Sequence, residues 1–479
     1  MVQMANRVPQ RPRALAKVKP RTNSAITMPI VLVTFLLTIL TVAVPVVNGL
    51  TDPVVAIMMT IAMFSLYLTM AISIADRRFG LLVLLFCFYH IFFLLLPGML
   101  HTARGYFPFY AMSYPDDDIR IGITIVTIFC VGYSIGVIAF RRGVDTAKLK
   151  LVADKRYYSR TRLAAYAILL SCFTLGIVAI NGLEMFLLRR IDSEIQFDSA
   201  SVASQLIFNF ARVPSFISLC IFISLTKSRI TLPILAGLLF SIAAFLMVNW
   251  PAAIPRYYLF GYVFAFLYIL FDFSTTFRKF WFALALAVGL LIAFPLINFV
   301  GRGDARDILT FNPVEYYTES GDYDGFQSVL NIVQLVDDDG PSLGYQLLGV
   351  PVSPVPRSLW EDKPRPTGTR AAEHVGYPYT NISAPLASEV FVDFWWVGLV
   401  VFSPLIGYYS ARLDMSAVRR FQQNDSWYIM MMGLLVGFET ILLRGSLMSA
   451  ATPIALAFLL MFIAGLIGRS SRNGSTRRR

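Results

Sequence analysis

Residues 354–374, PVPRSLWEDKPRPTGTRAAEH, concentrate side chains whose types could do chemistry. The stretch holds four cations and one of the three histidines of the chain: Arg357, Lys363, Arg365, Arg370 and His374. The planar guanidinium of arginine binds anionic oxygens through two parallel hydrogen bonds and does not deprotonate. Histidine titrates near pH 6.5 and can accept a proton at neutral pH. These residue types suit the binding of an anionic group and the removal of a proton.

Further arginines lie inside apolar segments or where such a segment meets a loop: Arg212, Arg256, Arg302, Arg306 and Arg444. Arg212 falls in mid-segment, where an unpaired charge costs at least about 3 kcal/mol in a membrane, so it needs a polar cavity or a partner. Arg444 follows Glu439 by five residues, and an ion pair between them is an equal alternative to substrate binding. Arg256 can instead extend to the membrane interface. The two arginines of GRGDARD can pair with the aspartates of that stretch.

The elements that position these residues are set by a strongly apolar composition. Of the 479 residues, 57% are hydrophobic and only 15% are charged. A water-soluble protein of this size could not bury so much apolar surface, so the chain is predicted to be an all-α polytopic membrane protein. The four cysteines all fall in apolar segments and are interpreted as small core residues. No Gly-rich phosphate loop is present, which argues against an ATPase domain.

Twelve apolar segments approach the roughly 20 residues that a helix needs to cross the hydrocarbon core. We predict about twelve transmembrane helices over residues 27–47, 53–75, 79–98, 119–140, 163–181, 204–226, 231–249, 256–273, 281–299, 386–409, 427–447 and 450–468.

The distribution of cations predicts the orientation. With the N-terminus in the cytoplasm, the inside segments collect 28 of the 41 lysines and arginines. This asymmetry follows the positive-inside rule and places both termini in the cytoplasm. The net charge of +12 is therefore a topology signal that also attracts anionic lipid, and nucleic-acid binding is not needed to explain it. We predict five parts in chain order: a basic N-terminal tail (1–26), nine membrane helices (27–299), a large outer segment (300–385), three membrane helices (386–468) and a basic C-terminal tail (469–479).

The large outer segment, residues 300–385, is predicted to be folded. In GFQSVLNIVQLVDD, apolar residues recur at helical spacing, which predicts an amphipathic helix lying over the mouth of the membrane domain. Asp322 and Asp324 precede this helix and could cap it. The proline-rich part that follows cannot form regular helix, and Leu359 and Trp360 give it apolar anchors, so we expect an ordered loop.

Three motifs resemble those of the Wzy-type polymerases of O-antigen or oligosaccharide repeat units. Arg357 and Gly368 form an Arg-x10-Gly pattern within PRSLWEDKPRPTG, which looks like the Pro-Arg, Trp, Lys-Pro and Gly pattern of the family's periplasmic loop. SEVFVDFWWVG, from residue 388, is similar to the Glu-containing start of the next helix, and NWPAAIPRYY, from residue 249, to an earlier element. The second Arg-x10-Gly pattern of some members is absent, because Ala200 and Ser201 lie eleven positions after Arg189 and Arg190.

The resemblance implies a C-type glycosyltransferase-like fold in the bacterial inner membrane, with its active site facing the periplasm. It implies an enzyme that transfers a glycan from undecaprenyl pyrophosphate to a second lipid-linked repeat unit, with a chain-length regulator as a possible partner. The residues that would contact the pyrophosphate are Arg357, Arg256, Arg302, Arg306, Arg212, Arg444, Arg370 and Lys363. No cofactor is needed, and we expect no metal, since the acidic runs 116–118 and 337–339 are typical of solvated helix caps. Arginines can stabilise the leaving pyrophosphate in place of a metal.

The transfer also needs a base for the acceptor hydroxyl, and two residues compete for this role. His374 is the only histidine of the large outer segment, and its residue type suits proton removal near neutral pH. Glu389 is predicted one turn inside the tenth helix, with Asp393 four residues on and so on the same face. Two such carboxylates are costly in a membrane unless they face a wet cavity or pair with arginines.

Two other functions remain open at the level of sequence. An O-antigen ligase-like transferase would need arginines and a base around the same lipid-linked donor. A flippase or transporter of lipid-linked oligosaccharides usually shows two similar halves and short loops, whereas this chain has no detectable repeat and one dominant loop. That asymmetry favours an enzyme.

Overall fold

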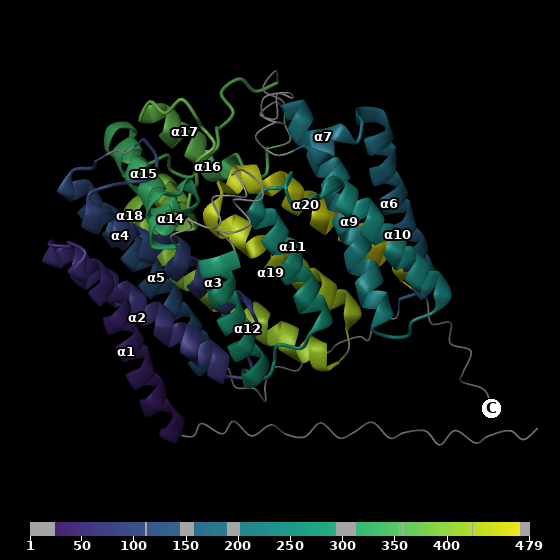
Figure 1. The fold of residues 1–479 in the computed structure, drawn as a ribbon, viewed down its shortest axis with the longest axis horizontal. Helices are drawn as coiled ribbons and strands as arrows, with labels where there is room; N and C mark the ends of the chain where they lie inside the picture. Colours follow the sequence, from purple (N-terminus) through teal and green to yellow (C-terminus); the bar gives the residue numbers. More distant parts are fainter. Residues whose placement is uncertain are drawn as a thin grey trace, which may run out of the picture.

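The computed structural model describes residues 24–110, 113–143, 158–188, 202–293, 313–353, 355, 359–423 and 425–469. Within these ranges the chain is helical, and extended backbone pairs at one isolated bridge between Tyr158 and Arg469. Figure 1 shows the arrangement. The elements, in chain order, are α1 (Ser24–Val47), α2 (Pro53–Ala75), α3 (Leu82–Tyr89), η1 (His90–Leu95), α4 (Leu96–Arg104), α5 (Asp116–Gly143), α6 (Arg160–Asn181), α7 (Glu184–Leu187), α9 (Val202–Thr226), α10 (Leu232–Val248), α11 (Arg256–Leu270), α12 (Thr276–Val288), η2 (Gly289–Ala293), α14 (Pro313–Glu319), η4 (Gly321–Tyr323), α15 (Gly325–Asp339), α16 (Tyr345–Leu348), α17 (Thr367–His374), α18 (Leu386–Gln422), α19 (Ser426–Arg444) and α20 (Leu447–Gly468).

The prediction of a polytopic helical membrane protein is confirmed. Among the described residues, nine helices are long and apolar enough to cross a membrane. Two further apolar helices, α10 and α11, have 17 and 15 residues. The predicted segment 281–299 is helical as far as it is described, to Ala293. The number of crossings and the side that faces the cytoplasm stay predictions.

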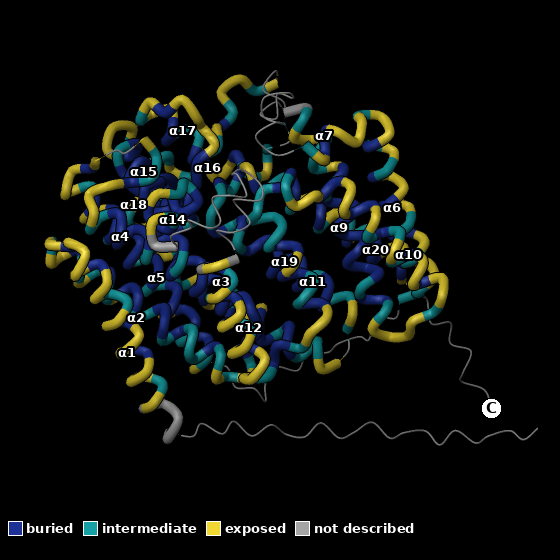
Figure 2. The backbone as a smooth tube through the Cα atoms, viewed as in Figure 1, coloured by how far each residue is buried: buried dark blue, intermediate teal, exposed yellow. Residues whose placement is uncertain are grey.

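Two groups of helices lie side by side, with α11 and α19 between them (Figure 1). One apolar core joins α2, α3, α5 and α18, and a second joins α6, α9, α11, α19 and α20. Helix α1 lies at the rim, and many of its apolar side chains are exposed, as expected for a lipid-facing helix (Figure 2). In a membrane, helices associate through small residues that let backbones approach. At the crossing of α11 and α19, a Cβ on Gly261 would lie 2.3 Å from the carbonyl oxygen of Gly437.

Two buried charges hold the turn between α2 and α3. The Lys279 ammonium of α12 donates to the carbonyl oxygens of Ser73, Asp76 and Phe79 near the end of α2. The Asp414 carboxylate of α18 accepts from the first backbone N–H groups of α3, including that of Leu82 at 3.1 Å. Each charge compensates the unsatisfied backbone groups of a helix end.

The helices of the large outer segment, α14 to α17, lie in the upper part of Figure 1. The first residues of α1 and the end of α20 lie at the lower edge. The outer segment therefore lies at one end of the bundle, and the start of α1 and the end of α20 lie at the other.

Helix α15 was correctly predicted as a helix, but it lacks the exposed polar face expected of an amphipathic helix. It is buried on nearly all sides up to Val336. Its polar residues have buried partners: Gln327 exchanges hydrogen bonds with the backbone of Phe109, and Asn331 accepts from the Tyr114 hydroxyl. Because these partners replace water, the helix can lie inside the protein rather than on it.

Helix α18 is broken at Trp395, whose φ of 52° and ψ of −149° are not helical. The break frees the carbonyl oxygen of Val392, which accepts from the backbone N–H of Ser342 at 2.8 Å. The Asp393 carboxylate next to it accepts from the Ser342 hydroxyl and from the backbone N–H of Gln346. The outer segment is thereby joined to the first two turns of α18.

Candidate functional site

Arg256, at the start of α11, binds the turn that precedes α15. Its Nη2 lies 2.5 Å from Asp322 Oδ1, and its Nη1 donates to the hydroxyl of Tyr316 at 3.1 Å. That hydroxyl donates in turn to Asp322 Oδ2 at 2.6 Å. Both charged side chains of the pair are only 10% exposed. The three residues therefore form a closed, buried ring of charge-assisted hydrogen bonds.

The electrostatics of Asp322 favour its charged form. Burial raises the pKa of this carboxyl, but the charge of Arg256 and the hydrogen bond from Tyr316 outweigh burial, so the pKa lies below its ordinary value. For Tyr316, burial and the nearby charge of Asp322 raise the pKa to about 12. The ring therefore consists of a carboxylate, a guanidinium and a neutral phenol at physiological pH.

Arg444, at the end of α19, binds the same turn from the other side. Its Nη2 lies 3.0 Å from Asp324 Oδ1, and its guanidinium stacks 4.0 Å above the ring of Tyr257. Asp324 is almost fully buried and also accepts from the backbone N–H and hydroxyl of Ser383. The structure thus brings Arg256 and Arg444 together around residues 322–324.

Two expectations about this cluster are wrong. Arg444 pairs with Asp324 and not with Glu439, because the outer segment brings a carboxylate within reach of the end of α19. Asp324 is at the cap position of α15, but its side chain makes no capping bond. Asp322 likewise directs its carboxylate to Arg256. Both aspartates compensate buried guanidinium groups, which need a charged partner more than a helix end does.

The stretch NWPAAIPRYY forms a turn that α9 supports. Arg212 donates from Nε to the carbonyl oxygen of Val248 at 3.1 Å and from Nη2 to that of Ala253 at 3.4 Å. Asn249 donates to the hydroxyl of Ser215 at 3.1 Å. The predicted need of Arg212 for a partner is met by backbone carbonyls at the end of α10. Arg212 therefore positions the turn that leads into Arg256.

Glu389 and Asp393 do not lie together in a wet cavity, and neither bonds an arginine in the described contacts. The Glu389 carboxylate is buried, accepts from the Thr367 hydroxyl at 2.7 Å and accepts from the backbone N–H of Leu447 at 3.0 Å. It therefore joins the start of α17 to the start of α20. Asp393 serves the turn at Ser342 described above. Hydroxyl and backbone donors compensate both carboxylates in place of water.

His374 and Arg370 lie one turn apart on α17 and bind the acidic end of α15. His374 Nε2 lies 3.1 Å from Asp338 Oδ2, and Arg370 Nη2 lies 2.9 Å from Asp339 Oδ2. The imidazole is 24% exposed, so one of its edges is open to solvent. An imidazole oriented by a carboxylate is the usual arrangement of a histidine base. The acidic run 337–339 is exposed, as expected of a solvated run, and two of its members also contact side chains of α17.

Four predicted cations remain, and one of them lies within the described residues. Lys363 donates to the carbonyl oxygens of Ser353 at 2.9 Å and Val355 at 2.8 Å, so it joins two parts of the proline-rich loop. Arg302, Arg306 and Arg357 lie outside the described residues.

Gly368 of the Arg-x10-Gly pattern lies where two backbones meet. A Cβ at this position would lie 2.6 Å from the carbonyl oxygen of Ile382 and 3.2 Å from that of Ser383. Ser383 is the residue that binds Asp324. A side chain on residue 368 would therefore push on the contact that holds Arg444.

We expect Gly368→Ala to lower the free energy of unfolding by about 1–3 kcal/mol, because backbone atoms cannot yield as a side chain can. The measurement is reversible unfolding of the purified protein in mixed micelles. The matched control is Gly176→Ala in α6, where an added Cβ would meet no heavy atom within 4 Å. Equal stabilities of the two variants would show that the 382–383 backbone moves without cost.

Several residues of this cluster were missed as site residues by sequence reasoning, namely Asp322, Asp324, Tyr316 and Ser383. The two aspartates were noticed only as caps. One signal was available: a membrane protein with arginines inside its helices needs carboxylates of its own.

Comparisons with known proteins do not identify this site. The chain matches no family model, no curated protein and no solved structure. The resemblance of its motifs to the Wzy-type polymerases therefore stands on the residues quoted above.

Proposed function

We propose that the chain is an integral membrane glycosyltransferase. It polymerises oligosaccharide repeat units linked to undecaprenyl pyrophosphate at the periplasmic face of the bacterial inner membrane. The observation that carries the proposal is the convergence of Arg256 and Arg444 at adjacent helix ends beneath the folded outer segment. A lipid-linked pyrophosphate must sit at this depth, with its isoprenoid tail in lipid and its sugars above.

The chemistry of the cluster suits such a donor. A guanidinium has five N–H donors, so one that binds a carboxylate can still donate to a phosphate oxygen. The aspartates fix the two guanidinium groups before substrate arrives, which lowers the cost of ordering them. Fixed cations would stabilise the negative charge that develops on the leaving pyrophosphate. The metal-independent reaction expected from the motifs is consistent with this arrangement.

The first experiment concerns Arg357, the arginine of the Arg-x10-Gly pattern. We expect Arg357→Ala to abolish long polymer in cells and Arg357→Lys to shorten and reduce it, since lysine keeps the charge but loses the bidentate fork. The readout is the length distribution of the glycan at equal expression of each variant.

The matched control is Arg365→Ala in the same loop. Arg365 is 56% exposed and pairs with Glu373 at 2.9 Å, an exposed pair whose loss costs little. Polymer of normal length and amount from Arg357→Ala would refute the role of this residue. Lipid-linked single units trapped on the cytoplasmic leaflet would point to a flippase, and failure to attach a finished polymer to its final acceptor would point to a ligase.

A further inference from the structure

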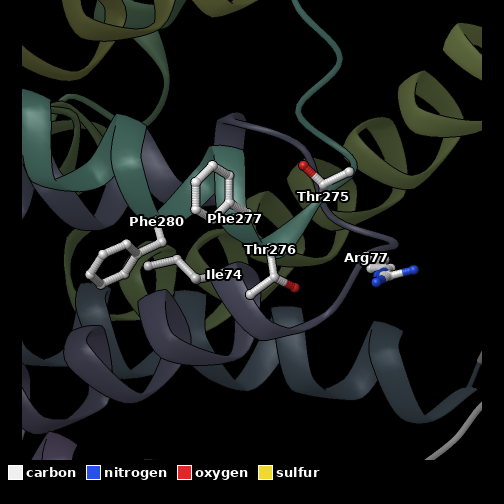
Figure 3. Close-up of a pocket in the computed structure, with 6 residues that line it drawn as sticks. All are labelled: Ile74, Arg77, Thr275, Thr276, Phe277 and Phe280. Atoms are coloured by element: carbon white, nitrogen blue, oxygen red, sulfur yellow. The ribbon is translucent and has the colours of Figure 1, made fainter.

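A cleft of about 500 Å³ lies at the end of the molecule opposite the outer segment, between the end of α2 and the start of α12. Figure 3 shows the six residues that line it: Ile74, Arg77, Thr275, Thr276, Phe277 and Phe280. Helix α2 is one of the apolar helices and ends at Ala75, so the cleft lies where hydrocarbon gives way to water.

The lining of the cleft is mostly apolar, and its one charged residue, Arg77, lies at the edge. Phe277 and Phe280 expose 71% and 51% of their surface, and Trp281 beside them exposes 51%. In Figure 3 the Arg77 guanidinium lies apart from the two phenylalanine rings, with the threonines between. Aromatic side chains exposed at this depth contact lipid chains, and a cation next to them lies at the level of the headgroups.

Arg77 is the cation of this region that the described contacts leave available. Its neighbour Arg78 binds Asp76 at 2.7 Å, and Arg141 binds the same carboxylate at 3.1 Å. The described residues provide no hydrogen-bond or ion-pair partner for the Arg77 side chain. One carboxylate thus binds two arginines, while Arg77 lies at the edge of the cleft.

The local balance of charge is positive. Cations outnumber carboxylates around the cleft and its supporting turn: Arg77, Arg78, Arg141, Arg278 and Lys279 against Asp76, Asp272 and Asp414. An anionic group bound here would lower the mutual repulsion of these cations. A zwitterionic headgroup would lower this repulsion less, because its own ammonium adds a positive charge.

We propose that this cleft binds the phosphate of one anionic phospholipid, with Arg77 on the phosphate and Phe277 and Phe280 against the acyl chains. The site is independent of the glycosyl transfer proposed above and lies at the other end of the molecule. A lipid fits better than a free anion because the lining is mostly apolar and two of its six residues are exposed phenylalanines. A juxtamembrane cation attracts anionic lipid, and the cleft adds contacts to the acyl chains.

The test is native mass spectrometry of the purified full chain with dioleoyl phosphatidylglycerol or with the phosphatidylcholine of the same chains. We expect the phosphatidylglycerol to bind at least fivefold more tightly, and Arg77→Ala to remove that preference. The matched control is Arg142→Ala, which removes another exposed arginine of the same end, at the end of α5, outside the cleft. This control keeps the preference.

Two results would overturn the proposal. One is an equal loss of preference in Arg77→Ala and Arg142→Ala, which would mean diffuse attraction to the basic surface. The other is full displacement of the lipid by millimolar inorganic phosphate, which would mean a site for a free anion. A Phe280→Ser variant checks the apolar part: we expect weaker binding of phosphatidylglycerol, and unchanged binding would exclude the acyl-chain contact. Thermal unfolding without added lipid verifies that each variant folds.

Discussion

His374→Ala lowers the rate of polymerisation by roughly 10²- to 10⁴-fold if this imidazole removes the proton of the acceptor hydroxyl. The structure supplies two of the requirements of such a base. Asp338 holds Nε2 at 3.1 Å, and the ring is partly open to solvent. With Nε2 next to that carboxylate, Nδ1 is the nitrogen left to accept the proton. The measurement is turnover of purified lipid-linked repeat units by the wild type and by the variant.

Two further variants separate loss of the base from loss of structure. His374→Gln keeps an amide donor near Asp338 but offers no base, so we expect it to be as slow as the alanine variant. Glu389→Gln keeps an oxygen that can accept from Thr367 and Leu447, and we expect it to retain most of its activity. The opposite pattern, an inactive Glu389→Gln and an active His374→Ala, would assign the base to the carboxylate.

The second large effect concerns the ion pair between Arg444 and Asp324. Asp324→Asn preserves the shape of the side chain and an oxygen for Ser383 but leaves the guanidinium without its charged partner. Removing one member of a buried pair costs about 3–5 kcal/mol, because the remaining charge is uncompensated. We therefore expect Asp324→Asn, and separately Arg444→Met, to lower the free energy of unfolding by about that amount, measured in mixed micelles.

The double variant completes a thermodynamic cycle. Asp324→Asn combined with Arg444→Met leaves no unpaired charge, so its cost should be clearly less than the sum of the two single costs. The control pair is Arg365 with Glu373, which is exposed and should contribute less than about 1 kcal/mol. Single variants as stable as the wild type would show that this pair does not hold the outer segment on the membrane domain.

Composition and local pattern alone predicted most of the helices. Runs of apolar residues of about the length needed to span a bilayer have one stable form there, because every backbone polar group must be bonded within the segment. Each predicted segment accordingly contains a helix where it is described, although some described residues within the predicted bounds, such as 79–81, 271–273 and 445–446, are not helical. The helix at residues 325–339 was also predictable, since its apolar residues recur with the period of a helix.

What these helices contact was decided only by the tertiary structure. The periodicity of α15 predicted one buried face, but the partners of Gln327 and Asn331 come from residues more than 45 positions away. The break at Trp395 likewise depends on Ser342, whose backbone N–H donates to the carbonyl oxygen of Val392 in place of a hydrogen bond within the helix. The local sequence around a helix does not indicate which distant residues will donate hydrogen bonds to it.

The candidate site shows the same division. Sequence identified Arg256, Arg444, Glu389 and His374 as residues that need an explanation, because charges near a membrane are costly and histidine is rare in this chain. Which carboxylate compensates which arginine was not predictable from spacing. Arg444 and Asp324 are 120 positions apart, whereas Glu439, the near neighbour in sequence, is not the partner. Two charged groups pair when the packed helices bring them to about 3 Å from each other, however far apart they are in sequence. Only the folded chain determines which groups meet.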